Sequence, residues 1–253
     1  MEAASETTEI LSAEDREQFD RDGYMVIDSV GSPKGVLDGV VTDLEDLYTS
    51  KEGEEKGVGY FRHRIRNGWK ISENVKAVSL DPKVLAVLGA LYGRKAIPFQ
   101  TLNFRKPSRQ AAHSDGIHFN SVPADFMCGV WVALEDMDEA NGPLIYYPGS
   151  HKLPLVTMQD VGVEAGRDHY SEYTRYIANV IRDRALQPAY ATIRKGQALV
   201  WATNLLHGGA PVKDKSRTRL SQVTHYYFEG CQYYNPMESE PDNLHYTEPA
   251  WVT

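Results

Sequence analysis

The first third of the chain spaces its apolar residues in the manner of helices joined by short connections. Residues 33–47 and 81–93 place apolar side chains three and four positions apart behind a serine or aspartate, which predicts two helices. Residues 12–23 have a start signal at Ser12, acidic residues in the first turn and a stop signal at Gly23, which predicts a third. Between the helices at 12–23 and 33–47, "YMVIDSV" at 24–30 predicts a strand. Residues 50–70 are charged and glycine-rich without periodicity, so we expect a mobile loop there.

After residue 95 the pattern changes to short runs of β-branched and aromatic residues, separated by Gly, Pro, Asn and Asp. A polar, tyrosine-rich stretch at 155–190 interrupts these runs and predicts helix over part of its length. Helices followed by many strands argue against alternating βαβ units. They favour a mainly β fold, an antiparallel barrel or double-sheet sandwich with flanking helices. The runs lie at 97–104, 127–134, 143–149, 197–203 and 219–228.

The length of 253 residues suits a single domain. Within residues 1–253 we expect four parts. They are a flexible tail at 1–10, a helical flank at 11–95, a β core at 96–230 and a C-terminal extension at 231–253.

Charge and composition exclude some classes of function. The formal net charge is -8 and no basic face is visible, so a nucleic-acid partner is not expected. The chain contains no run of about 18 apolar residues, so we expect no membrane span. The acidic, polar start does not resemble a signal peptide. The two cysteines, Cys128 and Cys231, sit in apolar or aromatic surroundings and are interpreted as small buried hydrophobes. We expect a cytoplasmic protein, as a monomer or homodimer, with a small-molecule substrate.

The stretch "AAHSDGIHF" contains a candidate metal site. On an extended segment, His113 and Asp115 would point to the same face. His207, which follows a strand and precedes two glycines, is the best third ligand. Two imidazoles and one carboxylate would leave coordination positions open on ferrous iron. Zinc accepts the same ligands, so a zinc hydrolase remains an alternative. His118 has the opposite strand parity, so it suits substrate contact or packing better.

An arginine downstream could bind an anionic cosubstrate. Arg219 opens the run "RLSQVTHYYF", and Ser221 shares its strand face. A planar guanidinium beside a hydroxyl would clamp a carboxylate well. Arg217 in the same stretch is the rival, and we prefer Arg219 because it begins the apolar alternation.

Several motifs together resemble the phytanoyl-CoA dioxygenase family of iron(II)/2-oxoglutarate-dependent oxygenases. They are the His-x-Asp, "GVWVALEDMDEANGPLIYYPGSHK", the distal "LVWATNLLHGGAP", and an arginine six residues before a histidine in the last strand. The resemblance covers roughly residues 95–230, and the opening "REQFDRDGYMVI" matches as well.

The resemblance implies a double-stranded β-helix, a cupin-like jelly roll. It also implies iron(II) bound by His113, Asp115 and His207, with dioxygen and 2-oxoglutarate as cosubstrates. Arg219 would hold the 2-oxoglutarate carboxylate, together with Ser221. Gln100 and Leu102 would line the cosubstrate pocket. Because the chain keeps Asp115, the resemblance favours hydroxylation over halogenation.

The expected reaction is hydroxylation, or another oxidation, of an unactivated carbon in a small molecule, with 2-oxoglutarate decarboxylated to succinate and carbon dioxide. We expect a natural-product intermediate as substrate. An acyl-CoA hydroxylase, with phosphates bound by the basic "FRHRIRNGWK", and a catalytically silent jelly-roll binding protein are alternatives. His151 in the "PGSH" turn is interpreted as a cap for backbone groups. Substrate contacts are expected from Tyr60, Phe61, His118, Phe119, Asn120 and Trp131, of which Trp131 suits the core better.

Overall fold

The computed structural model describes residues 10–48, 59–61 and 64–253 of the chain. Six α-helices are described: α1 (Ala13–Asp22), α2 (Val36–Leu44), α3 (Glu73–Ser79), α4 (Pro82–Tyr92), α5 (Met158–Val161) and α6 (Tyr170–Asp183). The strands are β1 (Tyr24–Ile27), β2 (Gly59–Phe61), β3 (Arg64–Arg66), β4 (Ala96–Phe104), β5 (Asn120–Val122), β6 (Met127–Ala133), β7 (Leu144–Tyr146), β8 (Ala189–Tyr190), β9 (Ala198–Ala202), β10 (His207–Gly209), β11 (Ser221–Phe228) and β12 (Gln232–Tyr234).

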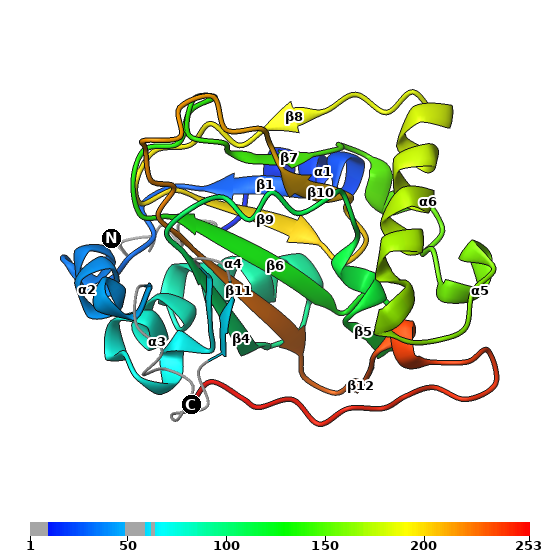
Figure 1. Cartoon of the computed structure of the whole chain (residues 1–253). Helices are drawn as coiled ribbons and strands as arrows, with labels where there is room; N and C mark the ends of the chain where they lie inside the picture. The colour runs from blue at the N-terminus through cyan, green and yellow to red at the C-terminus, as the bar shows by residue number, and fades with distance from the viewer. Residues whose placement is uncertain (1–9, 49–58, 62–63) are drawn as a thin grey trace.

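Two antiparallel sheets form the body of the molecule. The larger sheet has seven described strands in the order β1-β9-β6-β11-β4-β3-β2, and the smaller has the order β10-β7-β8. Figure 1 shows the smaller sheet above the larger one, with α6 at one end and α2, α3 and α4 beside and behind the larger sheet. A third pairing joins β12 to β5. The predicted class, mainly β with flanking helices in a jelly roll, is confirmed.

Both faces of the large sheet are covered, and β6 shows how. Cys128, Val130 and Val132 belong to a core cluster shared with the N-terminal helices. The alternate residues Trp131 and Ala133 belong to a second cluster between the two sheets. Because successive side chains of a strand point to opposite faces, a central strand between two cores is apolar throughout.

The predicted helix ends at 12–23 and 81–93 agree with the structure. Ser12 caps α1 in a capping box with Asp15, and Gly23 ends it in the left-handed region at φ 79°. The carboxylate of Asp81 accepts hydrogen bonds from the first backbone N–H groups of α4. No helix in the described ranges is both long enough and apolar enough to cross a membrane.

Three expectations need correction. The second helix begins at Val36 rather than Pro33, because Gly35 adopts φ 92°, which is not helical. The expected loop at 50–70 contains β3, whose Ile65 is 1% exposed, so one apolar residue between arginines was enough for a strand. Cys231 is only half-buried, although Cys128 is fully buried. The expected tail at 1–9 and loop residues 49–58 and 62–63 lie outside the described residues.

Candidate active site

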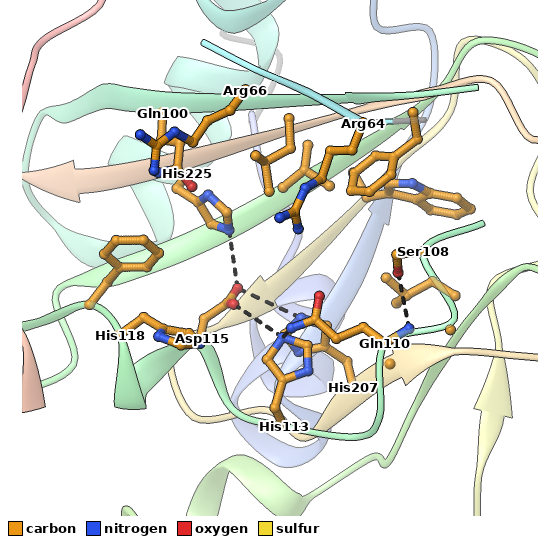
Figure 2. Close-up of a pocket in the computed structure, with 18 of the residues that line it drawn as sticks. Arg64, Arg66, Gln100, Ser108, Gln110, His113, Asp115, His118, His207 and His225 are labelled. Atoms are coloured by element: carbon orange, nitrogen blue, oxygen red, sulfur yellow. Dashed lines mark hydrogen bonds and ion pairs between the residues drawn. The ribbon is translucent and has the colours of Figure 1, made fainter. Parts of the chain in front are cut away.

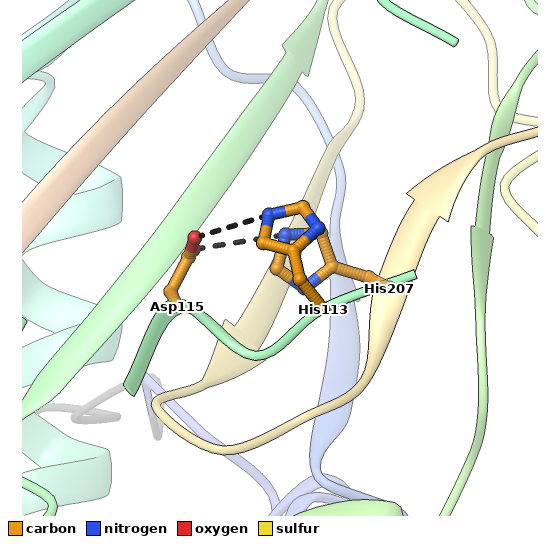
Figure 3. Close-up of side chains that lie close together, drawn as sticks. All are labelled: His113, Asp115 and His207. Carbon is orange, nitrogen blue, oxygen red and sulfur yellow. Dashed lines mark ion pairs between the residues drawn. The ribbon is translucent and has the colours of Figure 1, made fainter. Parts of the chain in front are cut away.

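The structure brings His113, Asp115 and His207 together in the interior of the jelly roll (Figure 3). The two histidines lie on neighbouring backbones, and each donates its N–H to the other's carbonyl over 2.9 Å. Nε2 of His113 is 3.7 Å from Oδ1 of Asp115, and Nε2 of His207 is 3.7 Å from Oδ2. One candidate ligand atom from each residue lies within 4.8 Å of the other two.

The backbone orients both imidazole rings. Nδ1 of His113 lies 2.9 Å from the carbonyl of Ala111, and Nδ1 of His207 lies 2.9 Å from that of Leu205. A carbonyl can only accept, so Nδ1 carries the proton in each ring and the lone pair resides on Nε2. Such a contact to the second nitrogen is how ligand histidines are commonly fixed in metal sites.

Asp115 reaches the cluster by a route that the sequence argument did not foresee. The segment is not a strand at this point, because Asp115 begins a 3-10 turn, η4 (Asp115–Ile117), capped by the side chain of Ser114. The same-face argument for positions two apart was therefore wrong in its geometry, although the three side chains do meet. The extended backbone of Ser114 turns the carboxylate back toward the histidines.

Two donors from the large sheet hold Asp115. Trp201 on β9 donates its indole N–H to Oδ2 over 2.9 Å, and Nε2 of His225 on β11 is 3.2 Å from the same oxygen. The Trp201 ring lies over Gly129, where a Cβ atom would be 2.2 Å from it. Since Oδ2 is occupied by these donors, Oδ1 is the oxygen better available to a metal ion.

The protonation states suit metal binding. Burial alone would raise the pKa of the Asp115 carboxyl, but the imidazoles of His207 and His225 outweigh it and hold the pKa well below the usual range. Burial lowers the pKa of His207 to about 4. At neutral pH the cluster therefore offers an anionic oxygen and a neutral imidazole, which are the forms that bind metals. This donor set fits ferrous iron, with positions left open for further ligands.

Arg219 lies in the same cavity with little to neutralise its charge. It is 4% exposed, and burial lowers its pKa to about 10. Nη1 is 3.4 Å from Oγ of Ser221, whereas Nε is buried without a hydrogen-bond partner. The guanidinium carbon lies 5.2 Å from the ring centroid of Phe104 and 5.4 Å from that of Trp131. A buried guanidinium with an orphaned N–H calls for an anion.

The rival arginine is placed differently. Arg217 pairs with Asp138 over 2.5 Å at the surface, and it does not line the cavity. Its charge is already neutralised, so the geometry favours Arg219 as the anion-binding residue.

The cluster and Arg219 open into one cavity of about 640 Å³ (Figure 2). Of the residues expected to contact cosubstrate or substrate, Gln100, Leu102, His118, Phe119 and Trp131 line it. Ser221, which contacts Arg219, is not among its lining residues. Asn120 is not among them either. Its side-chain oxygen instead accepts from the backbone N–H groups of Ser121 and Asp125, so it stabilises a turn. The side chains of Tyr60 and Phe61 lie outside what the structure describes.

Some residues of the site were missed by sequence reasoning. Trp201 and His225 touch Asp115, and Gln110 joins His113 to Tyr170, with Nε2 3.2 Å from His113 Nε2 and 3.0 Å from the hydroxyl. Strand alternation could have found His225, since it is four residues after Ser221 and so shares its face. No local pattern predicts Gln110.

Helix α6 packs against the segment that carries His113 and Asp115. The hydroxyl of Tyr173 accepts the backbone N–H of Ser114 over 3.2 Å, between two of the candidate ligands. Tyr173 is fully buried in a cluster with Ile117 of η4 and Ile177 of α6. His151, expected to cap backbone groups, contacts the carbonyl of Asp20 near the end of α1 at 3.3 Å.

Comparisons with known proteins agree with this geometry. Residues 19–219 match the family model of phytanoyl-CoA dioxygenase (PhyH). The chain is 26% identical over 254 residues to a probable phytanoyl-CoA dioxygenase of Caenorhabditis elegans, covering 89% of this chain and 78% of that protein. It is 25% identical over 223 residues to ectoine dioxygenase of Nocardia farcinica, covering 79% and 72%.

Solved structures share the fold. The crystal structure of EctD from S. alaskensis with bound Fe superposes with a TM-score of 0.72 at 19% identity, covering 98% of this chain and 92% of that one. The non-heme alpha ketoglutarate dependent carbocyclase SnoK from nogalamycin biosynthesis gives a TM-score of 0.66 at 18% identity, covering 88% and 86%.

Proposed function

The chain belongs to the phytanoyl-CoA dioxygenase family, and from this premise we propose that it hydroxylates an unactivated carbon of a small natural-product intermediate. Its reaction class is that of an iron(II)- and 2-oxoglutarate-dependent dioxygenase, in which 2-oxoglutarate is decarboxylated to succinate and carbon dioxide. The observation that carries this proposal is a two-histidine, one-carboxylate cluster that shares a cavity with a buried arginine whose Nε has no partner.

His113, Asp115 and His207 would hold the iron, which supplies the activation of dioxygen when bound. The chain's own contribution is to keep these ligands fixed and correctly protonated. Trp201 and His225 restrain Oδ2 of Asp115. The same oxygen lies 3.7 Å from Nε2 of His207, so Oδ1 is left facing His113. Preorganised ligands avoid the cost of reordering when the ion binds.

Arg219 and Ser221 would bind the far carboxylate of 2-oxoglutarate. An anion in this position would satisfy the orphaned Nε and restore charge balance to a guanidinium that is 4% exposed. The rings of Phe104 and Trp131 exclude water there, which strengthens the ion pair. Gln100 and Leu102 would line the remaining wall of the cosubstrate site.

A small substrate would occupy the part of the cavity near His118, Phe119 and Tyr170. The likeness to a carbocyclase from nogalamycin biosynthesis supports a natural-product substrate, whereas the likeness to phytanoyl-CoA dioxygenases favours an acyl-CoA thioester as the second candidate. A zinc hydrolase or a silent binding protein has no need of a buried arginine whose Nε lacks a hydrogen-bond partner.

The test uses purified chain loaded anaerobically with iron(II) and 2-oxoglutarate, then exposed to oxygen. We expect succinate to form slowly without substrate, and not at all with His207→Ala. Each sample is repeated with zinc(II), which supports no decarboxylation. Absence of succinate from the iron-loaded native chain would refute the proposal.

A further inference from the structure

The two glycines after His207 allow another segment to approach β10 closely. A Cβ atom at Gly208 would lie 2.9 Å from the carbonyl oxygen of Gln110, which is too close for any side chain. A Cβ atom at Gly209 would lie 3.0 Å from the backbone of Arg109. The backbone N–H of Gly209 donates to the carbonyl of Gln110 over 3.0 Å. The segment that carries Gln110 is therefore fixed directly beside the strand that begins with His207.

The side chain of Gln110 contacts the atom of His113 that would bind a metal ion. Its Nε2 is 3.2 Å from Nε2 of His113 and 3.0 Å from the hydroxyl oxygen of Tyr170. Figure 2 shows this side chain extending to the ring of His113. Since Nδ1 of His113 donates to the carbonyl of Ala111 over 2.9 Å, Nε2 carries the lone pair and accepts. The amide of Gln110 is therefore the donor, with one N–H directed to His113 and the other to Tyr170.

A metal ion and an N–H group cannot share this lone pair. A metal ion binds the lone pair of a neutral imidazole at about 2.1 Å. The N–H of Gln110 occupies that lone pair on His113, so the amide has to move before the ion can bind. The hydrogen bond from Gln110 is not required to orient the ring, because the carbonyl of Ala111 already holds Nδ1. Its net effect on the metal site is therefore competition with the ion.

We propose that Gln110 is a positioning residue that lowers the metal affinity of the site: its amide competes with the ion for Nε2 of His113, and Tyr170 holds the amide in place. The inference rests on the proposed function in taking His113 as a metal ligand, and it adds a residue that opposes metal binding. Displacing the amide costs its hydrogen bond, so the site releases the ion more readily than its three ligands alone would.

The test measures the affinity of the metal-free chain for zinc(II), and under anaerobic conditions for iron(II), by titration in competition with a chromophoric chelator. Gln110→Leu removes the amide and keeps an apolar side chain of similar bulk. We expect it to bind both ions about threefold to tenfold more tightly than the native chain, because one competing hydrogen bond is lost. Gln110→Ala should change the affinity in the same direction. Gln187→Leu is the matched control, at an exposed glutamine whose amide donates to the carbonyl of Ala185, and should leave the affinity unchanged.

A double-mutant comparison tests the part assigned to Tyr170. Tyr170→Phe removes the acceptor of the second amide N–H, so it should also tighten metal binding, by a smaller factor than Gln110→Leu does. Because the hydroxyl acts through Gln110, adding Tyr170→Phe to Gln110→Leu should change the affinity by no more than about twofold. Gains that add fully in the double variant would show that the hydroxyl acts independently, and would overturn this part of the inference.

Two results would overturn the inference as a whole. One is an unchanged metal affinity in both Gln110 variants, which would show that the amide leaves Nε2 of His113 at no cost. The other is a weaker affinity in these variants, which would give the amide a supporting role at the site instead of a competing one. Thermal unfolding of the metal-free proteins verifies that each variant is folded. The proposed function fails separately, if the native chain binds neither ion or if His207→Ala binds them as tightly as the native chain does.

Discussion

The indole N–H of Trp201 donates to Oδ2 of Asp115 over 2.9 Å, from a ring that crosses the position where Gly129 has no side chain. These two strand residues are paired in the register of β6 and β9. The position of the Asp115 carboxylate thus depends on the absence of a side chain at Gly129 of β6. Any side chain at that glycine would displace the ring that restrains Asp115.

We expect Gly129→Ala to weaken iron(II) binding by about tenfold to a hundredfold, the usual effect of losing an outer-shell partner of a metal ligand. The added Cβ would lie 2.2 Å from the Trp201 ring and force it away from Asp115. Metal titration followed by competition with a chelator measures the affinity.

Two further variants test whether the lost hydrogen bond causes this effect. Trp201→Phe removes the same hydrogen bond without the clash and should weaken iron binding in the same direction. Gly89→Ala in α4 is the matched control, since its new Cβ would meet nothing closer than 3.8 Å. It should stabilise the helix by about 1 kcal/mol and leave iron binding unchanged. Native affinity in Trp201→Phe would exclude the indole from any role at the metal.

Arg219→Gln should raise the concentration of 2-oxoglutarate needed for half-maximal succinate formation by at least about tenfold, because a buried charge pair is lost. Arg217→Gln should change it by no more than about twofold, since the exposed pair with Asp138 contributes little. Succinate formation is measured across a series of 2-oxoglutarate concentrations. The reverse ranking of the two variants would place the anchor at Arg217.

Much of the fold was predictable because it follows from periodicity. Some features depend only on residues that are close in the sequence, so they can be predicted from the sequence alone. Examples are the helix caps Ser12 and Asp81 and the apolar runs of β6 and β11. Strand β3 was not predictable in this way. Its two arginines line a cavity on the side of the strand opposite to the buried Ile65, and that cavity depends on the tertiary structure.

The candidate site was also predictable only in part. The residue types at 113, 115 and 207 predicted a metal site, and the position of Arg219 at the start of an apolar run predicted an anion-binding residue, a role that the resemblance supports. The contacts of Trp201 with Asp115 and of Gln110 with Tyr170 join segments 86 and 60 residues apart. Such pairings are set by how the strands and helices pack, so they carry no spacing signal in the sequence.

The metal-free chain should lose stability as the pH falls, and His118 should account for part of the loss. Burial lowers the pKa of His118 from its ordinary value of 6.5 to about 4. Above pH 6.5 the ring is neutral in both folded and unfolded chains. Between pH 6.5 and 4 the unfolded chain takes up the proton more readily, so acid favours unfolding.

Urea unfolding at pH 7 and pH 5, with a chelator present, measures this effect. The loss of stability between the two pH values should be about 1–2 kcal/mol smaller in His118→Phe than in the native chain. Phenylalanine keeps the ring that lies 5.3 Å from that of Tyr170. An equal loss in both proteins would show that His118 is not the titrating group.

Tyr173→Phe should destabilise the fold by about 1–3 kcal/mol, because it leaves the buried backbone N–H of Ser114 without its acceptor. The same change should weaken iron binding, since Ser114 connects His113 to Asp115 and the turn would be free to shift. Tyr176→Phe is the matched control on the same helix, at a residue that is 36% exposed, and should change neither property. Thermal unfolding without metal and a metal titration separate the two effects.

If Tyr173→Phe lowers stability but binds iron normally, then α6 stabilises the fold without positioning the ligands. If stability is also unchanged, water has replaced the hydroxyl and the contact contributes nothing.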